Sequence, residues 1–339
     1  MLTDTSNGLL HHGGKLRQAA AHYAIPLAQW LDLSTGINPN GWPVPPPPAT
    51  TWSRLPEEQD GLEQAARDYY GAEALLAVAG SQAAIQALPL LRSASRVAIL
   101  GPTYAEHAHA WRRAGHNIST IVDGEINSAV AQSEVVVLVN PNNPTGIRFS
   151  VDQLLQWHER LAVRNGWLVV DEAFIDSTPE QSLCRYAHRS GLIVLRSLGK
   201  FFGLAGARVG FVCAAPALLE QLNGLLGPWS ITGPARYVAT LALQDRVWQA
   251  QARSRLVVEG ERLRALLTGH GLAPARGCAL FQWVPMAQAA ILHDQLAQQG
   301  ILTRLFTQPA SLRFGLPADE PSWQRLDTAL TSMKVPNHE

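Results

Sequence analysis

The chain has 339 residues, of which 47% are hydrophobic and 16% are charged, so it is long and apolar enough to bury a sizeable core. Lysine plus arginine number 27, as do aspartate plus glutamate, and a net charge near zero gives no reason to expect a nucleic-acid or membrane partner. The N-terminal sequence lacks a basic region followed by an apolar run, and no apolar stretch reaches the length of a bilayer span. We therefore expect a soluble cytoplasmic protein.

The three cysteines, Cys184, Cys213 and Cys278, lie far apart in the sequence. They form no CxxC pair and match no metal-ligand spacing. We expect buried free thiols in a reducing compartment and no metal site.

Four consecutive prolines occupy residues 45–48 within the segment GWPVPPPPAT. Consecutive prolines favour the polyproline II conformation and do not fit inside a helix or a central strand. We interpret this segment as a stiff connector between an N-terminal arm and the main domain. A ligand for a proline-binding module is the alternative.

After this connector, helices and strands alternate. The apolar patterns and turn signals predict helices at residues 61–70, 81–91 and 150–165, and strands at residues 75–80, 96–100, 134–140, 166–172, 192–198 and 207–214. The segment EVVVLVN at 134–140 is almost entirely apolar, which is typical of a strand covered on both faces. This alternation predicts an α/β fold with a mostly parallel central sheet flanked by helices.

A long helical stretch begins near Pro234 and runs past Arg262, and short strands with one helix follow it. These later elements predict a smaller α+β domain, with the domain boundary inside the long helix. The chain is thereby divided into an N-terminal arm at 1–45 that joins the small domain as an active-site lid, a large domain at 46–240, and a C-terminal small domain at 241–339.

Polar residues follow four of the predicted strands. Asp171 ends one strand, NPNNPTG (140–146) follows another, Lys200 lies just past a third, and GSQ (80–82) follows the fourth. Each has an ordinary structural explanation, such as a helix cap, a turn or a solvated charge. Because ligands of open α/β sheets bind outside the carboxyl ends of the strands, the four together predict one ligand site.

The run SLGKFFGLAGARVG (197–210), together with NPNNPTG and DEAF (171–174), resembles the lysine motif and companion motifs of fold-type I aminotransferases and their relatives. The resemblance covers nearly the whole chain. It implies a large domain with a mostly parallel sheet, a smaller α+β domain, and pyridoxal 5′-phosphate (PLP) as the cofactor. It also implies a homodimer that shares its active sites.

The same resemblance assigns the cofactor contacts. Lys200 would hold PLP as a Schiff base, Asp171 would pair with the pyridine nitrogen, and Asn143 would donate to the phenolate oxygen. The cofactor phosphate is assigned to Gly80, Ser81, Gln82, Ser197 and Arg208. Tyr104 matches the aromatic residue that stacks on the ring, with core packing as the alternative.

Three further features resemble one branch of this family, the threonine-phosphate decarboxylases of cobalamin biosynthesis. They are His12-Gly13-Gly14 with LDLSTGINPNGWP (31–43), the segment GPWSITGPARYVATLALQD (227–245), and Phe174. Histidinol-phosphate aminotransferases usually have a tyrosine at the position of Phe174. The resemblance implies decarboxylation of L-threonine O-3-phosphate to (R)-1-amino-2-propanol O-2-phosphate and CO2.

Such a substrate carries a carboxylate and a phosphate, and the resemblance assigns its binding to Arg313, Arg304, His12 and Asn38. A surface salt bridge is the alternative for each arginine, and a solvated loop residue is the alternative for His12. Leu55 stands where relatives have a tyrosine that reaches the cofactor phosphate of the neighbouring subunit. That cross-subunit bond is therefore absent or supplied by another group.

Three other functions remain open from the sequence. A phospho-substrate aminotransferase would need a keto acid and would convert the cofactor to its pyridoxamine form. A PLP-sensing regulator would need a DNA-binding module, and the roughly fifty residues before the main domain carry no basic helical pair. A non-catalytic relative would not need to keep both Lys200 and Asp171.

Overall fold

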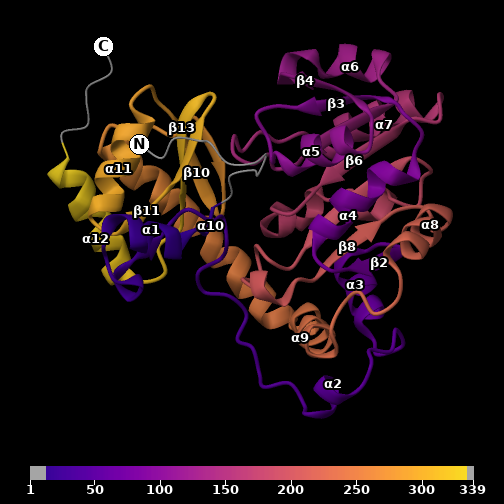
Figure 1. Ribbon diagram of the computed structural model, residues 1–339, viewed down its shortest axis with the longest axis horizontal. Coiled ribbons are helices and arrows are strands. Elements are labelled where there is room, and N and C mark those ends of the chain that lie inside the picture. The colour runs from indigo at the N-terminus through magenta and orange to yellow at the C-terminus, as the bar shows by residue number, and fades with distance from the viewer. Residues whose placement is uncertain (1–12, 334–339) are drawn as a thin grey trace.

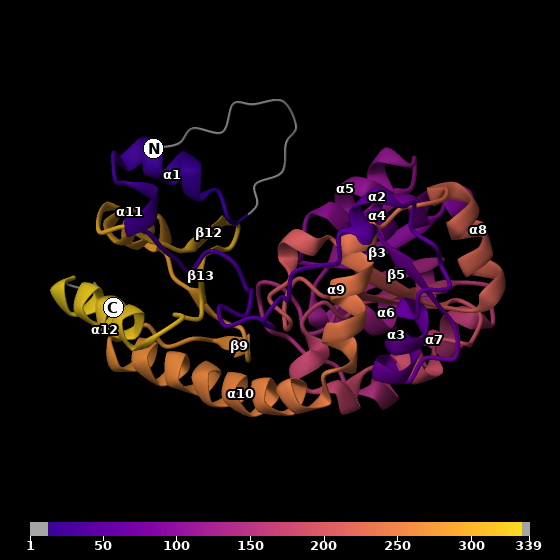
Figure 2. The same ribbon diagram turned by 90° about the horizontal axis from the view of Figure 1, so that it is seen from below.

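The computed structural model describes residues 13–333 and has two lobes. The larger lobe carries a seven-stranded sheet, and the smaller one joins the N-terminal segment to the C-terminal elements (Figure 1). The helix α10 (Arg246–Gly269) runs from one lobe to the other, as Figure 2 shows along the lower side of the molecule. None of the helices in the described residues is long and apolar enough to cross a membrane.

The large sheet has the strand order β2-β8-β7-β6-β5-β3-β4. Its strands are β2 (Leu75–Val78), β3 (Arg96–Leu100), β4 (Asn117–Ile121), β5 (Val135–Val139), β6 (Trp167–Asp171), β7 (Leu192–Ser197) and β8 (Gly210–Cys213). Only β8 runs against its neighbours, and all other pairs are parallel. The predicted mostly parallel sheet is confirmed.

Alternate side chains of these strands enter two different hydrophobic cores. On β5, for example, Val135 and Val137 pack on one face, whereas Val136 and Leu138 pack on the other. The first face is covered by α4 (Ser81–Ala87), α5 (Glu106–Arg113) and α8 (Pro216–Leu226), and the second by α3 (Leu62–Tyr70), α6 (Ile126–Gln132), α7 (Val151–Ala162) and α9 (Gly233–Gln244). The three cysteines are buried and free, as predicted.

The smaller lobe contains a four-stranded antiparallel sheet of order β12-β13-β10-β9 and a two-stranded parallel pair. Its elements are α1 (Leu16–Tyr23), β1 (Leu31–Asp32), β9 (Arg276–Cys278), β10 (Phe281–Pro285), α11 (Ala289–Gln298), β11 (Ile301–Leu302), β12 (Arg304–Thr307), β13 (Ala310–Gly315) and α12 (Glu320–Ser332). The N-terminal segment joins this lobe because β1 pairs with β11, and Ala19 and Trp30 pack against Ala297. The domain limits expected from the sequence stay a prediction.

The prediction of one continuous helix from Pro234 past Arg262 is wrong. The backbone leaves the helical conformation at Asp245, where ψ is 78°, so α9 and α10 are separate helices. The Asp245 carboxylate accepts a hydrogen bond from the backbone N–H of Trp248 at 3.0 Å and thus caps the start of α10. It also accepts one from the indole N–H of Trp42 at 3.0 Å. The break is therefore fixed by a contact with a distant segment.

A buried ion cluster lies under the carboxyl ends of β6 and β7. The Arg196 guanidinium donates to Glu172 at 2.9 Å and to Asp176 at 2.5 Å, and all three side chains are at most 1% exposed. Burial raises the pKa of Glu172, although Arg196 and Ser182 act against this rise. Asp176 also accepts a hydrogen bond from the hydroxyl of Tyr69 at 3.0 Å. These bonds tie the two adjacent strands together on the face turned away from α4 and α5.

We expect Arg196→Met to lower the free energy of unfolding by about 3–5 kcal/mol, because two buried carboxylates lose their partner. Urea unfolding followed by circular dichroism measures this change. Arg96→Met is the matched control, since Arg96 also lies on a strand of this sheet but pairs with Glu134 at the surface. The control should change stability little. An equal effect of both substitutions would contradict the role of the buried cluster.

Candidate active site

Two adjacent parallel strands bring the predicted residues to one edge of the large sheet. β6 ends at Asp171 and β7 ends at Ser197. Because side chains alternate along each strand, Asp171 and Ser197 point to the face covered by α4 and α5, whereas Glu172 and Arg196 point to the buried ion cluster. The same two strand ends therefore supply a polar site on one face and an ionic anchor on the other.

Lys200 lies in the turn that follows β7. Its Nζ lies 5.5 Å from the centre of the Phe174 ring, and no described residue forms a hydrogen bond or ion pair with its amine. Burial, together with the positive charges of Arg313 and Arg208, lowers the pKa of this amine to about 8, while the charge of Asp171 acts in the opposite direction. A substantial fraction of the amine is therefore neutral and nucleophilic near pH 8.

Asp171 is 3% exposed and its carboxylate has two partners. Oδ2 lies 3.0 Å from Nε2 of His107, on α5, and Oδ1 accepts a hydrogen bond from the backbone N–H of Ala173 at 3.0 Å. His107 is itself 1% exposed. The carboxylate is thus held in one orientation at the edge of the sheet.

Arg208 packs against the backbone at the start of α4. A Cβ on Gly80 would lie 2.7 Å from Nη2 of Arg208, and Gly80 has a φ of +72°, so glycine fits both the contact and the conformation. A Cβ on Gly210 would lie 2.5 Å from the backbone nitrogen of Ser81. The Ser197 hydroxyl accepts a hydrogen bond from the N–H of Gly199 at 3.2 Å. Glycine at two positions thus lets these segments approach closely.

Gln82 connects the start of α4 to the segment that leads into α5. Its Oε1 accepts a hydrogen bond from the hydroxyl of Tyr104 at 3.1 Å, and its Nε2 donates to Glu106 at 2.7 Å. Burial, with Glu106 and Asp171, raises the pKa of Tyr104 to about 12, so the hydroxyl keeps its proton. The side chain of Gln82 thus bonds Tyr104 and Glu106, in addition to the position of its backbone at the start of α4.

Arg313, on β13, reaches the site from the smaller lobe. It donates from Nη1 to Oδ1 of Asn143 at 2.5 Å and from Nη2 to the carbonyl of Ser34 at 2.8 Å. Its Nε is buried and has no hydrogen-bond partner among the described residues. Burial, then the charge of Arg304, lowers the pKa of Arg313 to about 10, which still leaves it cationic near neutral pH. The structure thus brings this arginine and Asn143 together.

The other expected substrate residues differ in their placement. Arg304, on β12, lies directly across the antiparallel pair from Arg313, so the two cations are neighbours in the small sheet. Asn38 is 2% exposed, and its side chain is bonded to Phe201 and Arg255. Because its side chain is bonded to protein groups, Asn38 is better suited to holding the backbone in place than to the expected contact with substrate. His12 lies outside the described residues.

Sequence reasoning missed two contributors to the site. His107 could have been noticed because it is an ionisable side chain close to Tyr104, in the segment that follows the predicted strand at 96–100. Ser34 gave no such signal, because it holds Arg313 through a backbone carbonyl that any residue possesses. Side-chain chemistry could therefore have indicated His107 but not Ser34.

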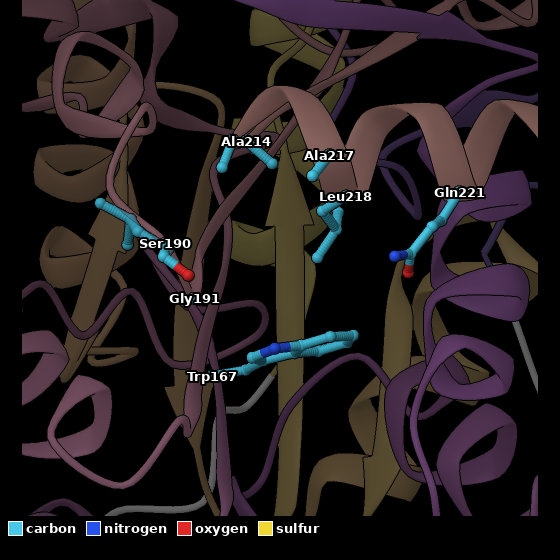
Figure 3. Close-up of a pocket in the computed structure, with 9 residues that line it drawn as sticks. Trp167, Ser190, Gly191, Ala214, Ala217, Leu218 and Gln221 are labelled. Atoms are coloured by element: carbon cyan, nitrogen blue, oxygen red, sulfur yellow. The ribbon is translucent and has the colours of Figure 1, made fainter.

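A separate pocket lies at the opposite edge of the large sheet (Figure 3). The Trp167 ring faces Ala217 and Leu218 of α8 across it, with Gln221 further along the same helix. Trp167 is the first residue of β6, whereas Asp171 is the last. This pocket is therefore separated from the candidate site by the length of the strands.

A model of the aminotransferase class I and II family matches residues 55–337, so the chain belongs to this family. Enzymes of this family depend on PLP, and the chain is a PLP-dependent enzyme. The predicted family, fold and cofactor are confirmed.

Two relatives and one solved structure place the chain more closely. It is 57% identical over 331 residues to the threonine-phosphate decarboxylase of Pseudomonas aeruginosa, covering 98% of this chain and 100% of that protein. It is 41% identical over 332 residues to a threonine-phosphate decarboxylase of a Sinorhizobium species, covering 96% and 98%. The structure of the Sinorhizobium meliloti histidinol-phosphate aminotransferase in complex with pyridoxal-5′-phosphate matches with a TM-score of 0.81 at 19% identity, covering 95% of this chain and 94% of that one. The last match shows a shared fold alone.

The residues at the sheet edge fit PLP. An amine with a lowered pKa suits attachment of an aldehyde, and a fixed buried carboxylate suits a protonated ring nitrogen. The close approach of Arg208 to Gly80 leaves a guanidinium beside the first backbone N–H groups of α4, which suits a phosphate. The cofactor that the family requires therefore has matching groups in this chain.

We expect Lys200 of the cofactor-free, full-length protein to react with a small amine-directed reagent with a half-maximal rate near pH 8, because only the neutral amine is a nucleophile. Mass spectrometry resolves it from Lys15, an exposed internal reference and one of two other lysines in the chain. Arg313→Gln should raise the midpoint, since it removes a positive neighbour. A midpoint near the ordinary lysine value in the unaltered protein would contradict the described environment.

Proposed function

We propose that this chain decarboxylates L-threonine O-3-phosphate, giving (R)-1-amino-2-propanol O-2-phosphate and CO2 for the side chain of cobalamin. The observation that carries the proposal is the convergence of Lys200, Asp171 and Arg313 at one edge of the sheet. The two threonine-phosphate decarboxylases that match nearly the whole chain support this substrate. An aminotransferase acting on a phosphorylated substrate is the alternative.

Phe174 favours decarboxylation over this alternative. Its ring is 4% exposed and packs edge-on against Phe281, with centroids 5.1 Å apart. A Cβ on Gly36 would lie 2.8 Å from this ring, so the N-terminal segment closes directly over it. Phenylalanine offers no hydroxyl to the cofactor, whereas the aminotransferases resembled by the chain usually have tyrosine here.

Each candidate residue has one role in holding the cofactor. Lys200 would attach it through the side-chain amine, and Asp171 would accept a hydrogen bond from the protonated ring nitrogen while His107 holds the carboxylate in place. Asn143 would donate to the phenolate oxygen, and Tyr104 would contact the ring. The backbone at residues 80–82, with Ser197 and Arg208, would bind the phosphate.

When bound, PLP supplies an electron sink for the electron pair that CO2 leaves on the substrate α-carbon. Asp171 keeps the ring nitrogen protonated, because a fixed negative charge opposes loss of that proton. Arg313 binds an anionic group of the substrate through its planar fork, and Arg304 adds positive charge beside it. Lys200, as an ammonium ion, delivers a proton to the α-carbon. The step releases CO2 and consumes one proton.

The test is to incubate the PLP-loaded protein with L-threonine O-3-phosphate in the absence of any keto acid. We expect sustained release of CO2 and aminopropanol phosphate in equal amounts, measured by coupled CO2 assay and phosphorus NMR. Lys200→Ala should abolish both, because it removes the cofactor attachment and the proton donor.

The alternative function, transamination, predicts a different result, which a second incubation with histidinol phosphate detects. If no CO2 appears and the cofactor absorbance moves to the pyridoxamine form with histidinol phosphate, the chain is an aminotransferase. The assignment of Lys200 would survive that outcome, whereas the decarboxylation proposal would not.

We also infer a homodimer with shared active sites. Large apolar side chains lie exposed around α2 (Thr50–Ser53) and the loop before α9: Trp52 is 71%, Leu55 65% and Trp229 60% exposed. α2 packs closely on α9, since a Cβ on Gly233 would lie 2.4 Å from the carbonyl of Thr51. Apolar residues in this arrangement suit burial against a second copy of the chain. The family resemblance supports the same surface, because relatives have at the position of Leu55 a tyrosine that reaches the cofactor phosphate of the neighbouring subunit.

We expect sedimentation velocity to give a dimer for the unaltered protein and a monomer for Trp52→Glu, because a charge buried in an apolar interface is unfavourable. Val163→Glu is the control, since Val163 is 87% exposed at the end of α7, away from α2. Dimers of unchanged stability in Trp52→Glu would exclude this surface as the interface.

A further inference from the structure

The backbone turn that carries Lys200 is held by a short N-terminal segment, residues 38–42, called the strap below. The backbone N–H of Asn38 donates to the carbonyl of Lys200 at 3.0 Å, and its side-chain Nδ2 donates to the carbonyl of Phe201 at 2.8 Å. The N–H of Trp42 donates to the carbonyl of Phe202 at 2.8 Å. Three consecutive carbonyl groups of the lysine turn thus accept hydrogen bonds from the strap.

The strap and the turn also meet without room for side chains. A Cβ on Gly41 would lie 2.8 Å from the carbonyl oxygen of Phe202, and a Cβ on Gly203 would lie 2.6 Å from Cα of Gly41. Gly203 has a φ of +71°, a conformation that glycine adopts without strain. Because backbone meets backbone here, the distance between strap and turn has little freedom.

The other side of the strap is bound to α10. Nη2 of Arg255 donates to Oδ1 of Asn38 at 3.1 Å and to the carbonyl of Asn40 at 3.0 Å. The indole of Trp42 donates to Asp245, which caps the same helix. Three hydrogen bonds therefore join the strap to Arg255 and Asp245 on the α10 side, and three join it to the lysine turn.

One further contact links this segment to the substrate arginine. Four residues before Asn38, the carbonyl of Ser34 accepts the hydrogen bond from Arg313. The Ser34 hydroxyl in turn donates to Asp32 at 2.6 Å and accepts from the N–H of Gly14 at 2.8 Å. A stretch of five residues thus holds the reacting lysine at one end and an anion-binding arginine at the other.

We propose that Asn38 is a positioning residue that fixes the Lys200 turn and sets the place of its amine relative to Arg313. The inference rests on the proposed function only in taking Lys200 as the lysine that carries the cofactor. Asn38 acts through the backbone of the turn, because its side-chain oxygen and nitrogen both form hydrogen bonds with protein groups. Substrate contact is not part of this role.

The pKa of the Lys200 amine is the property through which the effect of the strap can be measured. Charged groups reach its amine from three elements: Asp171 from β6, Arg313 from β13, and Arg208 from the segment before β8. The uncharged Phe174 ring lies beside it. Burial is the largest cause of its lowered pKa, so loosening the turn admits water and raises the pKa.

The experiment compares Asn38→Ala with Asn40→Ala in the full-length protein, freed of cofactor. The measurement is the pH at which Lys200 reacts at half its maximal rate with an amine-directed reagent, with Lys15 as internal reference. Asn38→Ala should raise this midpoint by about one pH unit, because the amine regains hydration. Asn40→Ala removes only the exposed bond from its Nδ2 to the Ala318 carbonyl and should leave the midpoint unchanged.

Arg255→Lys provides a second test that keeps the charge and leaves Asn38 intact. Nη2 of Arg255 bonds both Asn38 and Asn40 while Nη1 bonds Glu259, and the single ammonium of lysine does not keep this set of bonds, so a smaller shift in the same direction is expected. Thermal melting identifies any loss of fold. An unchanged midpoint in both folded variants, even with a lower melting temperature, would overturn the positioning role. A protein that fails to release CO2 while the midpoints shift would instead refute only the proposed reaction.

Discussion

The active site depends on one constraint, the two-residue period of a strand buried on both faces. Where β6 and β7 end, one residue points toward the candidate site and its neighbour in the sequence points into the core. Asp171 and Ser197 face the candidate site, and Glu172 and Arg196 form an ion pair on the opposite face of the sheet. Because that pair has essentially no exposure, it resists any shift of one strand end relative to the other. The site gains rigidity from residues that never meet a substrate.

The second constraint is the excess of positive charge. Lys200, Arg208, Arg304 and Arg313 surround a site whose fixed carboxylate is Asp171. Arg313 donates its hydrogen bonds to neutral oxygens, the amide of Asn143 and the carbonyl of Ser34, and Asp32 acts on its charge without a hydrogen bond to it among the described residues. An environment of this kind lowers the pKa of the lysine and suits a ligand with several negative charges. One arrangement therefore serves both cofactor attachment and anion binding.

Much of this architecture could be predicted from the sequence because its signals are local. The apolar runs of β5, β6 and β7 locate the strands, and polar residues immediately after them locate the site. The contacts that could not be predicted join distant segments. His107 meets Asp171 across 64 positions, and the helix break at Asp245 involves Trp42, 203 positions away. The resemblance assigned Asn38 to the substrate, and no local pattern reveals that the backbone carbonyl of Phe201, 163 positions away, accepts its hydrogen bond.

The strap also bears on the order in which the chain folds. Its residues leave the ribosome early, whereas the lysine turn follows more than 160 residues later and Arg255 later still. Contacts of such long range form only after intervening segments have collapsed and loop-closure entropy has been overcome. The surroundings that lower the pKa of the Lys200 amine include Arg313 of the smaller lobe, so they are assembled late, when both lobes have come together. The lysine proposed to carry the cofactor thus reaches its buried setting only in a chain that has completed its fold.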